Sequence, residues 1–164
     1  MLVLEEAFDV WTEPKRPDDY HIYFKEHSQN DLESMILRDR NHPSIVIWSV
    51  GNEIPERGDA IGLEITKQLV AAIHKNDLSR PITAAINPWL YSLPKHPWEY
   101  AYPIFDELDI AGNNYNWQEW DKYHQKYPEK PVMITESYPV EMNTVWTIIE
   151  KYPWAIGDFV WTAV

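Results

Sequence analysis

Short apolar runs alternate with longer helical stretches along the whole chain of 164 residues. The clearest apolar run covers residues 44–50, SIVIWSV, which is rich in β-branched side chains and is followed by Gly51. A continuous run of this kind is typical of a strand buried on both faces. Strands that alternate with helices indicate right-handed crossovers and a parallel sheet. The pattern therefore predicts an α/β fold.

Six strands are expected, with helices between most of them. The expected strands cover residues 1–4, 44–50, 81–86, 109–114, 131–135 and 156–162. The expected helices cover residues 18–37, 59–75, 117–127 and 141–151. A Pro- and Trp-rich excursion, residues 87–102, follows the third strand and has no clear periodicity.

This alternation fits either an open doubly wound sheet or part of a (β/α)₈ barrel. No Gly-rich phosphate loop follows any of the expected strands, which argues against a nucleotide-binding open sheet. A complete barrel needs at least about 200 residues, more than this chain has. We therefore expect one domain, residues 1–164, that is a partial barrel cut at both ends.

Composition excludes several classes of function. The chain has 14 basic and 26 acidic residues, and a surface of net charge −12 repels nucleic acid. The longest apolar runs are too short to span a bilayer, and the absence of cysteine excludes disulfides and thiol catalysis. The six histidines show no metal-binding spacing, so we expect neither a metal nor an organic cofactor.

Polar or aromatic residues follow the buried strands. Glu53 comes shortly after the second expected strand, Tyr115 after the fourth, Glu136 after the fifth, and Trp161 lies at the end of the sixth. In a parallel barrel the carboxyl ends of the strands meet on one face, and that face holds the active site. These side chains are therefore expected to lie together.

Two carboxylates at two strand ends suit glycoside hydrolysis. One carboxyl group donates a proton to the leaving oxygen, while the other acts on the anomeric carbon directly or through water. The carboxyl groups are about 5–5.5 Å apart in retaining enzymes and about 6.5–9.5 Å apart in inverting ones. The residues alone leave both mechanisms open, and each glutamate taken alone could simply cap or pair near a turn.

Two stretches resemble a known family. Residues 38–53, RDRNHPSIVIWSVGNE, resemble the acid/base signature of glycoside hydrolase family 2, which contains β-galactosidases, β-glucuronidases and β-mannosidases. Residues 131–137, PVMITES, resemble the nucleophile strand of that family. Residues 5–9, EEAFD, and 157–161, GDFVW, are similar to the ends of its third and eighth barrel strands.

The resemblance implies a partial TIM barrel with about the third through eighth strands, the first two being absent. It implies that Glu53 is the acid/base and Glu136 the nucleophile. It also implies that Asn52 binds the sugar's 2-hydroxyl, that Tyr115 donates a hydrogen bond to the nucleophile, and that Trp161 is a platform for the attacked sugar.

The implied activity is retaining hydrolysis of terminal β-linked sugars, β-galactosidase-like, through a covalent glycosyl-enzyme. The 164 residues alone are expected to be weakly active or inactive and to self-associate through unpaired strand edges at Leu2 and Val160. Two alternatives remain open: a retaining glycosidase or endoglycanase of another family in the same clan, and a non-catalytic carbohydrate-binding segment. The excursion leaves a further choice, since Trp89, Trp98 and Tyr100 suit either a sugar entry site or a hydrophobic loop packed on the rim.

Overall fold

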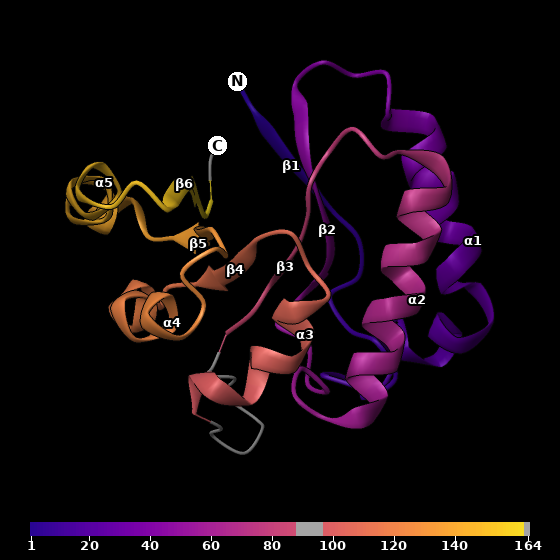
Figure 1. Cartoon of the computed structure of the whole chain (residues 1–164). Helices are drawn as coiled ribbons and strands as arrows, with labels where there is room; N and C mark the ends of the chain where they lie inside the picture. The colour runs from indigo at the N-terminus through magenta and orange to yellow at the C-terminus, as the bar shows by residue number, and fades with distance from the viewer. Residues whose placement is uncertain (88–96, 163–164) are drawn as a thin grey trace.

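The computed structural model describes residues 1–87 and 97–162, in which strands and helices alternate as expected (Figure 1). The strands are β1 (Val3–Glu6), β2 (Ile45–Asn52), β3 (Ile82–Ala85), β4 (Ala111–Asn114), β5 (Val132–Ser137) and β6 (Ala155–Val160). The α-helices are α1 (His21–Asp39), α2 (Ala60–Asn76), α3 (Tyr102–Asp106), α4 (Trp120–Lys126) and α5 (Met142–Lys151). Short 3₁₀ turns are η1 (Trp98–Ala101), η2 (Trp117–Glu119) and η3 (Pro139–Glu141).

All pairs of neighbouring strands are parallel and follow the order of the sequence. They form two three-stranded sheets, β1-β2-β3 and β4-β5-β6. A parallel bridge between Ile86 and Asn113 joins the sheets, and the Asn114 amide donates to the Ile86 carbonyl at 2.8 Å. The described residues therefore form an open parallel arrangement with the strand order of a barrel wall, and not a closed barrel.

The helices cover the sheets because their apolar sides need burial. In Figure 1, α1 and α2 lie beside β1–β3, while α4 and α5 lie beside β4–β6. Trp48 and Ile73 are fully buried in the main core, and Trp120 is 1% exposed there. A second, smaller cluster joins Ile47 of β2, Ile110 just before β4 and Met133 of β5. No helix among residues 1–87 and 97–162 is long and apolar enough to cross a bilayer.

Local hydrogen bonds fix where the long helices begin. Asp59 accepts from the Gly62 amide at 2.7 Å and caps α2, so the helix predicted over residues 59–75 starts one residue later, at Ala60. The first helix starts at His21 and not at residue 18. The Asp19 carboxylate accepts from the Lys15 and Arg16 amides, which holds the preceding segment in a turn.

The end of the excursion and the residues after it contain structure that the sequence did not predict, namely η1 and α3. Trp98 is 4% exposed, and its ring lies 5.0 Å from the ring of Phe105. Trp98 therefore belongs to a packed hydrophobic loop and not to an entry site, while Trp89 lies outside the described residues. Helix α3 escaped prediction because five residues are too few to show helical periodicity.

Candidate active site

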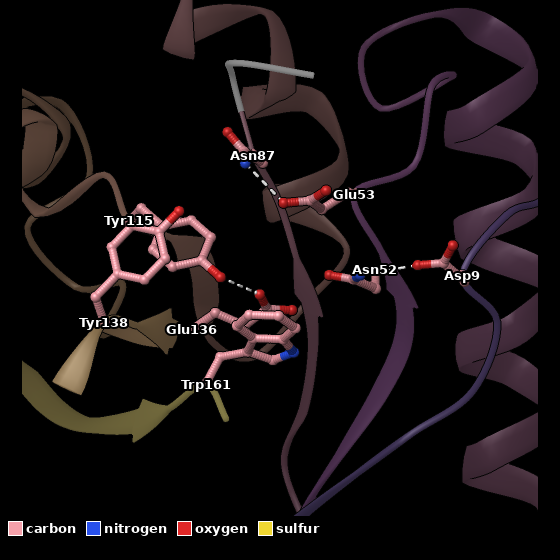
Figure 2. A pocket seen from close by; sticks show the side chains of 8 residues that line it. All are labelled: Asp9, Asn52, Glu53, Asn87, Tyr115, Glu136, Tyr138 and Trp161. Atoms are coloured by element: carbon pink, nitrogen blue, oxygen red, sulfur yellow. Dashed lines mark hydrogen bonds between the residues drawn. The ribbon is translucent and has the colours of Figure 1, made fainter. Parts of the chain in front are cut away.

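The carboxyl ends of the strands meet at one pocket of about 580 Å³ (Figure 2). The described residues that line it lie at the ends of β2 and β5 and in the segments that follow each of the six strands. The lining residues are Asp9, Asn52, Glu53, Asn87, Tyr115, Glu136, Tyr138 and Trp161. All five residues singled out in the sequence are among them, although they are spread over about 110 positions.

Glu53 follows β2 and its carboxylate is held by amide side chains. Asn87 donates to Glu53 Oε1 at 2.6 Å, and Asn114 donates to the same oxygen at 3.3 Å. The Glu53 amide donates to the Ala85 carbonyl at 2.7 Å, which ties its backbone to the end of β3. The side chain is thus oriented by two neighbouring strands and points into the pocket (Figure 2).

Glu136 lies near the end of β5 and has a different environment. The Tyr115 hydroxyl donates to Glu136 Oε2 at 2.6 Å, which is the contact that the family resemblance implied. Burial raises the pKa of Glu136, and the nearby charges of Glu53 and Asp9 raise it further. The hydrogen bonds from Tyr115 and Asn114 oppose this rise because they stabilise the ionised form.

The oxygen and the nitrogen of the Asn52 side-chain amide are both hydrogen-bonded. Its Oδ1 accepts from Asn114 Nδ2 at 2.9 Å, and its Nδ2 donates to Asp9 Oδ1 at 2.9 Å. Asn114 is itself oriented, since its Oδ1 accepts from the Thr135 hydroxyl at 2.6 Å. Among the described residues, this chain of bonds leaves one N–H of Asn52 available to a ligand in the pocket.

In Figure 2 the rings of Tyr115 and Tyr138 lie on the other side of Glu136 from Asn52, and the Trp161 ring overlaps Glu136 in this view. The rings of Tyr115 and Tyr138 are stacked, with centroids 4.4 Å apart and planes at 22°. Trp161 follows β6 and is 53% exposed. A pocket lined by both polar groups and aromatic rings suits a sugar, whose C–H faces are apolar and whose rim carries hydroxyls.

Three further pocket residues, Asp9, Asn87 and Tyr138, were not predicted from the sequence. Asp9 and Asn87 follow β1 and β3, so the same strand-end criterion that selected Glu53 would have found them. Tyr138 comes two positions after Glu136 and is placed by its stacking on Tyr115. Within the described residues, no group of three or more histidine, aspartate or glutamate side chains is arranged to hold a metal ion.

Parallel strands with helical crossovers define an α/β domain, and in this domain two glutamates share one pocket at the strand ends. A pair of carboxylates in such a pocket is typical of glycoside hydrolases. A family model described as the TIM barrel domain of glycosyl hydrolases family 2 matches residues 12–162. The chain therefore belongs to glycoside hydrolase family 2.

Individual relatives agree with this assignment. The β-galactosidase BoGH2A of Bacteroides ovatus is 33% identical over 167 residues, which cover 83% of this chain and 19% of that protein. A β-glucuronidase of Bacteroides fragilis is 27% identical over 84% of this chain and 24% of its own length. The crystal structure of a family 2 member from Bacteroides cellulosilyticus matches 99% of this chain and 20% of its own, with a TM-score of 0.90 and 35% identity. The chain thus spans about a fifth of the length of these relatives.

Proposed function

We propose that this chain carries the catalytic centre of a retaining β-glycosidase that acts on terminal β-linked sugars. The observation that carries the proposal is the placement of Glu53 and Glu136 in one pocket with different hydrogen-bond partners. We further infer that β1–β6 correspond to the third through eighth strands of the family's barrel, in line with the family match and the strand order.

The two glutamates divide the chemistry between two steps. Glu136 attacks the anomeric carbon, the bond to the leaving oxygen breaks, and Glu53 gives its proton to that oxygen. This step leaves a covalent glycosyl-enzyme. Glu53 then takes a proton from water, the water oxygen attacks the anomeric carbon, and Glu136 is released. Both steps pass through transition states with oxocarbenium character.

The other residues of the pocket support these steps. Tyr115 restrains the Glu136 carboxylate through the bond at 2.6 Å and favours its ionised form. The available N–H of Asn52 would donate to the 2-hydroxyl of the sugar, a contact that strengthens in the transition state. Trp161 would lie against the apolar face of the attacked sugar.

Charge in the pocket supports a neutral sugar. Asp9, Glu53 and Glu136 are carboxylates, and no lysine or arginine is among the described residues that line the pocket. The Lys15 ammonium lies close by, but it is engaged by Asp9 Oδ1 and by the Asn52 carbonyl, both at 3.0 Å. Among the described lining residues, a uronic acid would bring a fourth carboxylate and find no cation to pair with. The charges therefore favour a neutral sugar over a uronic acid, and the 33% identity to a protein named β-galactosidase favours a galactoside among the neutral sugars.

The experiment uses the full-length polypeptide that carries these residues, with aryl β-galactoside, β-glucuronide and β-mannoside as substrates. Glu136→Gln is expected to lower kcat on the β-galactoside by at least about 10⁴-fold while sugar binding persists, because the attacking group is lost. A 2-deoxy-2-fluoro β-galactoside is expected to label Glu136 covalently, as detected by peptide mass spectrometry.

The outcomes separate this proposal from its alternatives. Wild-type turnover without any covalent label would contradict the retaining step. Binding without turnover would indicate a carbohydrate-binding segment, and a strong preference for long oligosaccharides would indicate an endoglycanase. Residues 1–164 alone are expected to hydrolyse the aryl galactoside far more slowly than the full-length polypeptide, because the described strands do not close a barrel.

A further inference from the structure

Asp9 lines the pocket but takes no part in the two steps described above. It follows β1 by three positions, and its side chain is 69% exposed. In Figure 2 it lies on the far side of Asn52 from Glu136 and Trp161. A carboxylate in this position is next to the place where the ring hydroxyls of a bound sugar would lie.

The Asp9 carboxylate is oriented through one of its two oxygens. Lys15 Nζ donates to Asp9 Oδ1 at 3.0 Å, and Asn52 Nδ2 donates to the same oxygen at 2.9 Å. Lys15 is itself anchored, since it also donates to the Asn52 carbonyl at 3.0 Å and its side chain is only 15% exposed. Within the described residues Oδ2 accepts no hydrogen bond, so it remains an acceptor for a ligand.

We propose that Asp9 is a specificity-determining residue whose Oδ2 accepts a hydrogen bond from the sugar's 3-hydroxyl. The inference rests on the proposed function, in which Asn52 binds the 2-hydroxyl. The 3-hydroxyl is the neighbour of the 2-hydroxyl on the ring, and Asp9 is directly bonded to the Asn52 side chain. Two bonded side chains therefore meet two adjacent hydroxyls.

The arrangement favours this bond energetically. Hydrogen bonds to an ionised acceptor are roughly twice as strong as neutral ones. The Lys15 and Asn52 donors hold the carboxylate in place before the sugar arrives, so little ordering is needed on binding. We expect removal of either partner of the bond to lower kcat/KM by about 10- to 100-fold.

The test is a double-mutant cycle between enzyme and substrate, with the full-length polypeptide and the aryl β-glycoside that it hydrolyses fastest. Its kcat/KM is measured on that glycoside and on the 3-deoxy and 4-deoxy analogues, for the wild type and for Asp9→Ala and Asp9→Asn. The wild type is expected to lose about 10- to 100-fold on the 3-deoxy analogue. In Asp9→Ala the fall in kcat/KM from the glycoside to its 3-deoxy analogue (the 3-deoxy loss) is expected to shrink to about threefold or less. The corresponding fall for the 4-deoxy analogue (the 4-deoxy loss) should stay as in the wild type.

Asp18→Asn is the matched control, since Asp18 is an exposed carboxylate of the same segment and is not among the described pocket residues. It should keep both deoxy losses at wild-type size. Asp9→Asn preserves the side-chain shape and one acceptor, so it remains informative if Asp9→Ala folds poorly, and it is expected to show an intermediate 3-deoxy loss.

The proposal would be overturned if both Asp9 variants kept the full 3-deoxy loss and had kcat/KM lowered equally on all three substrates. Asp9 would then only hold Asn52 in place. Coupling of Asp9 to the 4-hydroxyl instead would overturn it as well. Failure of the proposed function looks different, since the wild type would then hydrolyse none of the glycosides.

Discussion

Glu53 and Tyr115 both adopt a left-handed backbone, with φ of 50° and 59°. Side chains other than glycine rarely occupy this region, and each such residue costs on the order of 1 kcal/mol. Backbone bonds to neighbouring strands hold them there, since Tyr115 N donates to the Glu136 carbonyl at 2.8 Å and Glu53 N to the Ala85 carbonyl at 2.7 Å. Strain of this kind at two pocket residues is common where side chains must be aimed at a ligand.

The first prediction at this scale concerns the hydroxyl of Tyr115. Its hydrogen bond lowers the pKa of Glu136, so Tyr115→Phe should raise that pKa further. Because the nucleophile must be ionised, the acidic limb of kcat/KM should move to higher pH, and the plateau should fall about 10- to 100-fold. The measurement is a pH–rate profile of the full-length polypeptide with an aryl glycoside. Tyr23→Phe, on the exposed side of α1, is the control, and an unmoved limb in Tyr115→Phe would contradict the prediction.

The second prediction concerns the stability of the chain. Burial first, and then the charges of Glu53 and Asp9, raise the pKa of Glu136 above its unfolded value, so folding favours the protonated carboxyl. Its contribution to the free energy of unfolding is fully present below the unfolded-state pKa and is lost as pH rises through the raised folded value. Glu136→Gln carries no charge and avoids this loss, so it should be more stable than the wild type at pH 7 by on the order of 1 kcal/mol.

Urea unfolding of residues 1–164 at pH 7 and at about pH 3 provides the measurement. The two proteins should be equally stable at the lower pH, where Glu136 is protonated in both states. Glu129→Gln, at an exposed site, should change stability by less than about 0.5 kcal/mol at either pH. A Gln variant that is less stable than the wild type at pH 7 would be the contrary result.

Among the secondary-structure elements, β4 depends on its glycine. A Cβ added at Gly112 would lie 2.4 Å from Thr83 Oγ1, 2.5 Å from the Ala84 carbonyl oxygen and 2.9 Å from Thr135 Cγ2. These atoms belong to β3 and β5, so Gly112 lets three strands approach closely where the two sheets join. The close approach there also brings the ends of β3, β4 and β5 to the pocket.

Gly112→Ala should therefore destabilise the fold by about 1–3 kcal/mol, because backbone atoms cannot move aside. Gly157→Ala on β6 is the matched control, since a Cβ there meets nothing within 4 Å. The comparison is made by denaturant unfolding of both variants and the wild type. Equal midpoints for the two alanine variants would refute the role given to Gly112.

At the scale of the whole molecule, the outer strands have pairing partners on one side only. Within the described residues β1 pairs with β2 alone and β6 with β5 alone. Leu2 and Ile156, at or beside these edges, are 67% and 49% exposed. Unpaired strand edges with apolar side chains favour association between chains.

Residues 1–164 should therefore oligomerise with rising concentration, as measured by sedimentation velocity. Leu2→Lys combined with Ile156→Lys should shift the distribution toward monomer, because charge on an edge opposes strand pairing. Leu78→Lys, at an 80% exposed site between α2 and β3, should leave it unchanged. A monomer at all concentrations, or an equal effect of the Leu78 change, would argue against edge pairing.

The sequence by itself determined the order and type of most elements, because each depends on local patterns. The apolar run of β2 and the periodicity of α2 gave both elements to within a few residues. Residues at strand ends could be named as pocket candidates, since parallel strands deliver their carboxyl ends to one face. The family followed from the two quoted stretches, which contain Glu53 and Glu136.

The tertiary structure alone decided which side chains share the pocket and how they are oriented. Asp9, Asn87 and Tyr138 join it through contacts with residues that lie up to about 43 positions away in the chain. Helix α3 forms where Phe105 packs against Trp98, a contact that local propensity does not encode. The physical reason is that hydrogen-bond partners and burial depend on distances between strands, and these are set by packing across the whole sheet and not by neighbours in sequence.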